Sequence, residues 1–97
     1  MINLKLHYES PFDRVAKSHH ETLKVEDGIT LRELFNYLSE KYGEDFEELL
    51  YDDKNPDDLN NFLCIIINGR TFRDENFLDR KLKEGDDISL FYGYFGG

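Results

Sequence analysis

The chain has 97 residues, of which 39% are hydrophobic and 14% aromatic, and it carries a net charge of −9 at pH 7. This length fits one domain with a modest core, and the hydrophobic content excludes an intrinsically disordered chain. Twenty-one acidic residues against 12 basic ones argue against nucleic-acid binding, which needs Lys and Arg to neutralise phosphate. The acidic excess favours a basic partner surface, with plain solubility as the alternative.

The sequence predicts neither an exported protein nor a membrane protein. No apolar run approaches the ~20 residues that a membrane-spanning helix needs. Residues 1–6 lack the basic start and the long apolar stretch of an export signal. Cys64 is the single cysteine, which excludes an internal disulfide. We therefore expect a cytoplasmic location, where thiols stay reduced.

The first part of the chain predicts two strands that pair as a hairpin. Apolar and polar residues alternate over residues 2–8, and this period of two indicates a half-buried strand. Residues 9–19 contain a Ser-Pro step and mixed charges, so we expect a loop there. Residues 22–25 give a second short strand, which Asp27-Gly28 ends.

A helix is predicted over residues 30–42. One continuous apolar stripe runs along it at helical spacing, formed by Leu31, Leu34, Phe35, Leu38 and Tyr42. Thr30 and Glu33 have the spacing of a capping box, in which each side chain accepts from the other residue's amide. Lys41 complements the helix dipole at the other end, and Gly43 is placed for a left-handed C-cap.

The middle of the chain predicts a short helix, a loop and a hairpin. The helix, over residues 44–51, would bury Phe46, Leu49 and Leu50. Residues 52–61 form an acidic, turn-rich loop. The uninterrupted apolar run 62–67 predicts a central strand covered on both faces. Asn68-Gly69 is a strong turn signal and leads into a short strand over 70–72.

The end of the chain completes the fold prediction. Residues 74–82 are irregular, with Phe77, Leu78 and Leu82 as anchors, and the last strand covers 87–92. This element order lays one main amphipathic helix across a mixed sheet in two layers. We therefore predict an α+β fold of the β-grasp type over residues 1–92, with residues 93–97 as a flexible tail.

The chain finishes on Gly96-Gly97, shortly after the last predicted strand. Glycine has no Cβ and reaches backbone angles closed to other residues, so such an end can thread a slot too narrow for side chains. This favours a terminal carboxylate that is handed to another enzyme. A cloning scar or a truncated chain is the alternative, because two glycines alone are a weak signal.

Residues with potential metal or redox chemistry have plain structural interpretations. Cys64 lies within an apolar strand and is interpreted as a small core residue. His19 and His20 point to opposite faces of a strand, so joint metal binding is not expected, and His7 is expected to face solvent. Asp58 stands where a calcium-binding loop needs glycine. No phosphate-binding loop, zinc spacing or catalytic pair occurs, so we predict neither a metal site nor a catalyst.

Residues 82–91 read Leu-Lys-Glu-Gly-Asp-Asp-Ile-Ser-Leu-Phe and are followed by Gly96-Gly97. This stretch resembles the ubiquitin-like sulfur carriers, above all the small subunit of molybdopterin synthase, which carry Leu-x-Asp/Glu-Gly-Asp-x-Val/Ile, an aromatic strand end and a terminal Gly-Gly. The helix start 31–35 and the strand-turn 65–69 fit the same family. One departure is Tyr92-Gly93, where the family often has a Pro-Pro pair, and it leaves the partner's identity open.

The resemblance implies a carrier that is a substrate and not a catalyst. A ubiquitin-type activating enzyme would use ATP and magnesium to adenylate the Gly97 carboxylate, which then becomes a thiocarboxylate. The sulfur would go to molybdopterin on the molybdopterin synthase large subunit, or to an equivalent acceptor. Gly93, Tyr94, Phe95 and Gly96 would enter the partner's active site, because residues 93–97 span at most roughly 17 Å.

Aromatic residues near the tail suggest where a partner docks. If Ile88 and Leu90 face the helix, then Phe91 lies on the open face of the sheet, where exposed aromatics can mark an interface. The opposite parity, or burial under the tail, is the alternative. Tyr94 and Phe95 favour a partner groove over packing back on the domain.

Two other functions stay open at this point. A ubiquitin-like protein modifier would be joined through Gly97 to lysines of other proteins. A non-covalent docking module would carry its glycines incidentally. The sequence separates sulfur transfer from conjugation poorly, and it does not identify the sulfur acceptor.

Overall fold

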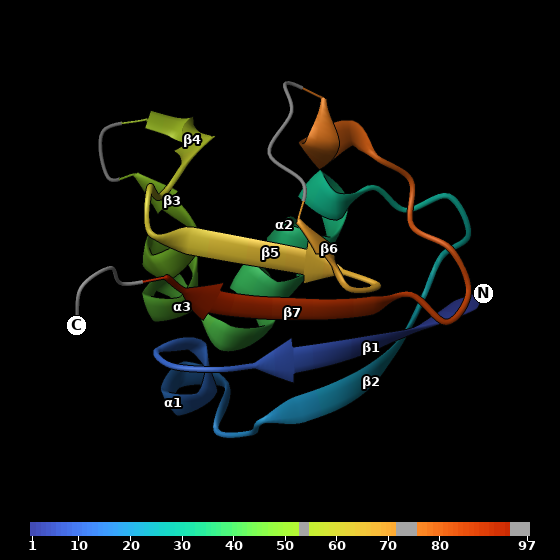
Figure 1. The fold of residues 1–97 in the computed structure, drawn as a ribbon, viewed down its shortest axis with the longest axis horizontal. Helices are drawn as coiled ribbons and strands as arrows, with labels where there is room; N and C mark the ends of the chain where they lie inside the picture. Colours follow the sequence, from blue (N-terminus) through green and yellow to red (C-terminus); the bar gives the residue numbers. More distant parts are fainter. Residues whose placement is uncertain (53–54, 72–75, 94–97) are drawn as a thin grey trace.

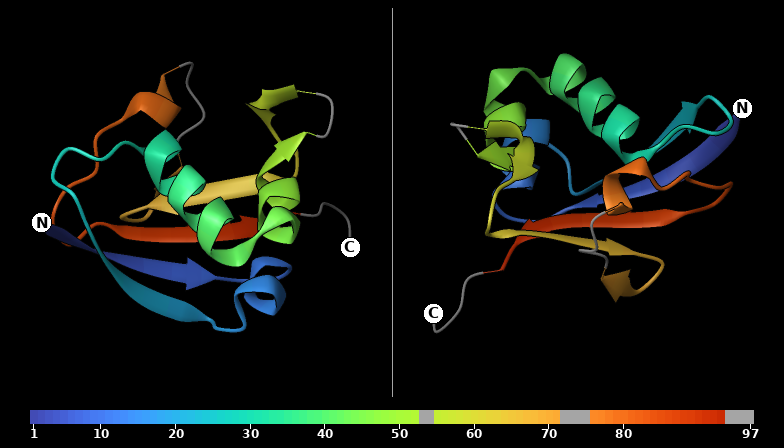
Figure 2. Two further views of the ribbon diagram at one scale, coloured as in Figure 1. Left: turned by 180° about the vertical axis from the view of Figure 1, so that it is seen from behind. Right: turned by 90° about the horizontal axis from the view of Figure 1, so that it is seen from above.

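The computed structural model describes residues 1–52, 55–71 and 76–93, which fold into two layers. A five-stranded sheet has the order β2-β1-β7-β5-β6, and helices cover one of its faces (Figures 1 and 2). Along the chain the elements are β1 (Ile2–Tyr8), α1 (Phe12–Ala16), β2 (His20–Val25), α2 (Leu31–Tyr42), α3 (Glu44–Leu50), β3 (Tyr51–Asp52), β4 (Asn55–Leu59), β5 (Leu63–Ile67), β6 (Arg70–Thr71), a 3-10 turn (Phe77–Asp79) and β7 (Asp87–Tyr92). This confirms the predicted α+β fold.

The last strand of the chain is the middle strand of the sheet. β1 and β2 form the predicted antiparallel hairpin, with Leu4 opposite Leu23. β7 lies between β1 and β5, parallel to the first and antiparallel to the second (Figure 1). Because β7 is bonded on both sides, the point at which the chain leaves the domain is fixed by the sheet.

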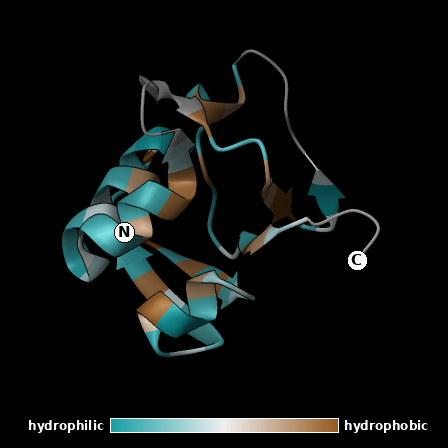
Figure 3. Cartoon of the chain, turned by 90° about the vertical axis from the view of Figure 1, so that its left-hand side faces the viewer, coloured by the Kyte–Doolittle hydropathy of each residue, from teal (hydrophilic) through white to brown (hydrophobic). Residues whose placement is uncertain are grey.

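The core lies between the covered sheet face and the apolar stripe of α2. The helix residues Leu31, Leu34, Phe35 and Leu38 are 0% exposed, and Tyr42 is partly buried. Apolar and hydrophilic residues are interspersed along the helices (Figure 3), as an amphipathic layer requires. The sheet side of the core consists of Leu4, Leu6, Tyr8, Leu23, Val25, Leu63, Ile65, Ile67, Ile88 and Leu90. The predicted anchors Phe46, Leu50, Leu78 and Leu82 are buried too, with Leu49 and Phe77 partly so.

Local signals fix both ends of α2. The Thr30 hydroxyl accepts from the Glu33 amide at 3.2 Å, and the Glu33 carboxylate accepts from the Thr30 amide at 3.1 Å, which confirms the capping box. Gly43 has φ 91° and ψ −171°, so its φ is positive as predicted but its backbone is not left-handed helical. Its amide donates to Ser39 at 2.8 Å and its carbonyl accepts from Phe46 at 3.1 Å. Gly43 therefore ends α2 and begins α3 at one residue.

The predicted loop 9–19 contains the short helix α1. Phe12 is 0% exposed, with ring centroids 5.3 Å from Phe46 and 5.6 Å from Tyr92. A helix of five residues is too short to show an apolar period. It is held instead by this aromatic contact, which joins segments far apart in the sequence.

The predicted loop 52–61 also differs from the structure. β3 and β4 pair as a separate two-stranded sheet, with Tyr51 opposite Leu59. Both residues are partly buried against the core. Pro and Asp are depleted in strands, so local propensity gives no sign of β4. Residues 53–54 lie outside the described residues, as does Phe72 of the predicted strand 70–72.

The prediction that the run 62–67 is covered on both faces is wrong. Leu63, Ile65 and Ile67 are buried, whereas Cys64 and Ile66 are half-buried on the opposite face of β5. Cys64 is therefore not a core residue. Within the described residues, helices lie on one side of this sheet only (Figure 2), and an unbroken apolar run cannot reveal which of its two faces stays uncovered.

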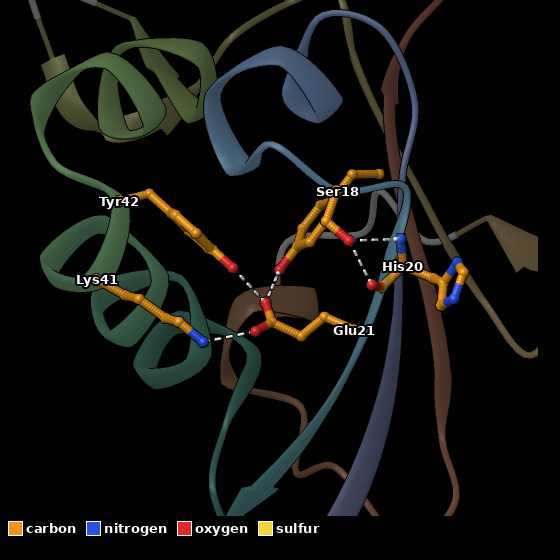
Figure 4. A network of polar contacts seen from close by, with 6 residues as sticks. Ser18, His20, Glu21, Lys41 and Tyr42 are labelled. Carbon is orange, nitrogen blue, oxygen red and sulfur yellow. Dashed lines mark hydrogen bonds and ion pairs between the residues drawn. The ribbon is translucent and has the colours of Figure 1, made fainter.

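A polar network joins β2 to the end of α2 (Figure 4). The Glu21 carboxylate accepts from the Tyr8 hydroxyl at 2.7 Å and from the Tyr42 hydroxyl at 2.6 Å, and it pairs with the Lys41 ammonium. Burial and the Glu21 carboxylate raise the pKa of Tyr8 far above its usual range. Although burial alone raises the pKa of Glu21, the hydrogen bonds from Lys41, Tyr42 and Tyr8 together lower it.

Candidate functional site

The end of β7 is held at three points. The Tyr92 amide donates to the Ser10 carbonyl at 3.3 Å, and the Tyr92 hydroxyl donates to the Leu49 carbonyl at 2.7 Å. The Gly93 amide donates to the Phe62 carbonyl at 2.8 Å. Gly93, which the sequence assigns to the tail, is thus bonded to the rim of the sheet. The other predicted tail residues, Tyr94, Phe95, Gly96 and Gly97, lie outside the described residues.

An apolar surface on the open face of the sheet adjoins this point, and we call it the tail-base patch: Cys64, Ile66 and Phe91. Phe91 lies opposite Cys64 in the sheet, and both are half-buried. Leu90 is 0% exposed on the helix side, so alternation places Phe91 on the open face, which confirms the predicted parity. The docking role of Phe91 stays a prediction.

The sequence did not single out Phe62 as a surface residue. Its side chain is 51% exposed, and its ring centroid lies 6.2 Å from that of Tyr92. Phe62 begins an apolar run and so looks like core. Its position just before β5 is the signal that would have found it, because a residue at a strand end can lie beyond the layer that covers the strand.

The segment that carries the family resemblance forms hydrogen bonds at the opposite end of β7, where the strand begins. Asp86 is 8% exposed, and its carboxylate accepts from the Lys83 amide and from the Asn68 side-chain amide, both at 2.8 Å. The Asn68 side-chain oxygen in turn accepts from the Asp87 amide at 2.9 Å. Gly85, which directly precedes Asp86 in this turn, has a φ of 80°, a backbone angle that favours glycine. These residues set the start of β7, and through it the position of Gly93.

His7 and His20 lie on the open face of the sheet, whereas His19 precedes β2 and faces Asp13 of α1. His7 lies opposite His20 across β1 and β2, and its Nε2 is 3.0 Å from Asp87. His19 lies 3.7 Å from Asp13. Within residues 1–52, 55–71 and 76–93, no group of three or more His, Cys, Asp or Glu side chains is arranged to hold a metal ion. In the same ranges, no helix is long and apolar enough to cross a membrane.

Comparison with known proteins identifies the family. The ThiS family model matches residues 12–97. The chain belongs to the ThiS family. A provisionally named sulfur carrier protein of Archaeoglobus fulgidus is 32% identical to this ThiS-family chain over 69 residues, which are 71% of the chain and 75% of that protein.

Two solved structures show the fold. A provisionally named molybdopterin converting factor subunit 1 from Pyrococcus furiosus matches with a TM-score of 0.72 and 23% identity, over 97% of this chain and 100% of that one. The small archaeal modifier protein 1 of Haloferax volcanii matches with a TM-score of 0.78 and 17% identity, over 97% and 100%. At such identities the likeness shows the fold alone, and that fold is the predicted ubiquitin-like β-grasp.

This ThiS-family chain is therefore a ubiquitin-like sulfur carrier. Members of the family are small carrier proteins rather than catalysts. The described residues contribute a stable platform to this activity. The sheet fixes the last strand, and an apolar surface lies beside the point where the chain leaves it.

Proposed function

We propose that the Gly97 carboxylate carries the sulfur, as a thiocarboxylate, for molybdenum cofactor biosynthesis. The observation that carries the proposal is the extent of the family match, which runs to residue 97 and so includes Gly96-Gly97. The anchored end of β7 supports it, because Gly93 is bonded to Phe62 at the rim of the sheet and four residues follow it in the sequence.

The chemistry requires an activating partner. A carboxylate is anionic at neutral pH and would have to expel oxide, so it is a poor electrophile. A carboxylate oxygen of Gly97 attacks the α-phosphate of ATP, and pyrophosphate leaves; magnesium held by the partner enzyme would neutralise charge on the phosphates. Hydrosulfide then attacks the acyl-adenylate carbon, and AMP leaves with the oxygen that sulfur replaces. One difficult substitution is thereby divided into two easier ones. The carrier supplies the carboxylate, and the partner enzyme supplies ATP, magnesium and the catalytic groups.

The reach of the tail suits this division of labour. Because Gly93 is bonded to the sheet rim, residues 94–97 extend from a fixed point. At 3.3–3.6 Å per residue they span at most roughly 14 Å. That length allows the terminal carboxylate to enter a partner's active site while the domain stays outside.

We propose the tail-base patch as the docking surface for the sulfur acceptor, a molybdopterin synthase large subunit or its equivalent. Phe91 is two residues before the anchored residue Gly93, so a partner that holds the patch also receives the tail. The net charge of −9 would speed the encounter with a basic partner surface through long-range attraction.

ATP–pyrophosphate exchange with the cognate activating enzyme tests the proposal. We expect exchange with the wild-type chain and none after deletion of Gly97, while the midpoint of thermal unfolding stays unchanged. A variant extended by one alanine after Gly97 is the matched control for the position of the carboxylate, and it should also be inactive. Exchange that survives the deletion would contradict the proposal, and loss of folding would mean that Gly97 has a structural role.

Conjugation to lysines is a second candidate, favoured by the full-length structural match to the small archaeal modifier protein 1. The sequence predicts which peptide remnants a protease would leave on a conjugated lysine. Lys83 is the last basic residue, so trypsin would leave residues 84–97 on a target lysine, whereas cleavage after Phe95 would leave Gly-Gly. Recovery of these remnants from cell digests would favour the modifier. If neither adenylation nor conjugates are found, a non-covalent docking module is the remaining interpretation.

A further inference from the structure

The anchored residue Gly93 lies directly against Cys64. A Cβ built on Gly93 would come within 2.8 Å of the Cys64 Sγ, closer than a Cβ comes to a non-bonded heavy atom in folded proteins. Apart from its neighbours in the chain, no other atom of the described residues lies within 4 Å of that Cβ. The obstacle at Gly93 is therefore one sulfur atom, at the end of a side chain that the sheet holds in register with Phe91.

A side chain at position 93 would bring this contact into conflict with the hydrogen bond that holds the Gly93 backbone. Its amide donates to the Phe62 carbonyl at 2.8 Å, and Phe62 is two residues before Cys64. A larger residue at position 93 has two ways to relieve the clash. Either the Cys64 thiol turns away, or the backbone of residue 93 lifts from the sheet and the amide bond to Phe62 breaks. Cys64 is half-buried and lies opposite Phe91 on the neighbouring strand. The two ways differ in the amide exchange of residue 93, because only the second breaks its bond to Phe62.

We propose that Gly93 and Cys64 form a size-matched pair that sets the point and direction in which the tail leaves the domain. The inference rests on the proposed function, because it is the delivery of Gly97 that needs a fixed starting point. Gly93 is then a positioning residue, and the Cys64 thiol is the group against which it packs. Any group added to the Cys64 sulfur fills the same space, so alkylation of the thiol would act like a larger residue at position 93.

Three variants test the pair: Gly93→Ala, Cys64→Ala and the double variant. The first readout is amide hydrogen exchange at residue 93, which needs no partner protein. In Gly93→Ala we expect its protection to fall at least about tenfold, since a local hydrogen bond opens. In the double variant protection should return, because the sulfur is gone. Unchanged exchange in Gly93→Ala, or no recovery in the double variant, would overturn the inference.

The second readout is activation by the cognate enzyme at saturating and limiting carrier concentrations. For Gly93→Ala we expect kcat to fall while the thermal midpoint changes little, and we expect the double variant to recover activity. Treating the wild-type chain with iodoacetamide should reproduce the Gly93→Ala defect and leave Cys64→Ala unaffected. If the wild-type chain is never activated, the proposed function fails, but the exchange measurement still decides whether the pair exists. A defect in Gly93→Ala that Cys64→Ala does not relieve would overturn the inference.

Discussion

The side-chain amide of Asn68 donates a 2.8 Å hydrogen bond to the carboxylate of Asp86. This bond ties the turn after β5 to the turn before β7, which are 18 residues apart in the sequence. The same carboxylate accepts from the Lys83 amide. The segment that most resembles other sulfur carriers therefore positions the last strand, and its residue Asp86 does so through these hydrogen bonds.

Replacing Asp86 with alanine should destabilise the fold. The change leaves the Lys83 amide and the Asn68 side chain without their acceptor, and a lost partner of a largely buried polar group costs about 1–3 kcal/mol. The measurement is the free energy of unfolding in urea. Asp79→Ala is the matched control, because Asp79 is 66% exposed and meets Arg32 at 3.4 Å, a kind of pair worth at most about 1 kcal/mol. Equal losses in the two variants would contradict this account of the turn.

Truncation of a core residue on α2 should cost more. Leu34 is 0% exposed, and Leu→Ala at such a site removes about 2–5 kcal/mol of unfolding free energy. Asn36→Ala, at an exposed position of the same helix, should change stability by less than about 0.5 kcal/mol. Thermal or urea unfolding of both variants tests this difference. A loss below about 1 kcal/mol for Leu34→Ala, close to the effect of a surface substitution, would exclude the packing described.

The Glu21 network should make the free energy of unfolding depend on pH in the acidic range. Burial raises the pKa of Glu21, but hydrogen bonds from Lys41, Tyr42 and Tyr8 hold it below the ordinary value of 4.5. A carboxyl group whose pKa is lower in the folded state stabilises the fold above its unfolded pKa, and this contribution is lost as pH falls through the folded value. We therefore expect wild-type stability to fall more steeply below about pH 5 than that of Glu21→Gln. Parallel curves from urea unfolding across this range would rule the network out as a source of acid sensitivity.

Phe91→Ala should weaken binding of the sulfur acceptor without unfolding the domain. Phe91 is half-buried on the open face beside the anchored end of β7, so its loss removes apolar contact area. We expect a loss of at least about tenfold in affinity, as for a contact worth 1.4 kcal/mol, measured by titration calorimetry. Thr22→Ala, at an exposed position on β2, is the control and should bind normally. Equal affinity of both variants would place the interface elsewhere.

The sequence predicts the parts of this fold whose signals are local. The alternation of β1, the stripe and capping box of α2 and the turn at Asn68-Gly69 each depend on neighbouring residues, and all are confirmed. Asn68 has φ 52° and Gly69 φ 81°, as a tight hairpin turn requires. The position of β7 at the centre of the sheet was not predicted, because it depends on pairing with β1 and β5, which lie far from it in the sequence.

The remaining features depend on contacts between distant segments. Phe12 holds α1 through contacts with aromatic rings of α3 and β7. The Glu21 carboxylate is hydrogen-bonded to Tyr8 and Tyr42, which are 13 and 21 positions away in the sequence. No local pattern contains such pairs. The surface position of Cys64 was missed for a related reason, because an apolar strand reads alike whether one face or both are covered. The contact between Gly93 and the Cys64 sulfur is likewise visible only in three dimensions.

Intact mass spectrometry tests the central claim most directly. The wild-type chain is incubated with its cognate activating enzyme, ATP, magnesium and a sulfide source, beside the variant that lacks Gly97. If the Gly97 carboxylate is the sulfur site, the wild-type mass rises by about 16 Da as sulfur replaces oxygen on the activated carboxyl, and the variant is unchanged. A wild-type mass that stays constant, with no acyl-adenylate detected, or an equal shift in the variant, would contradict the claim.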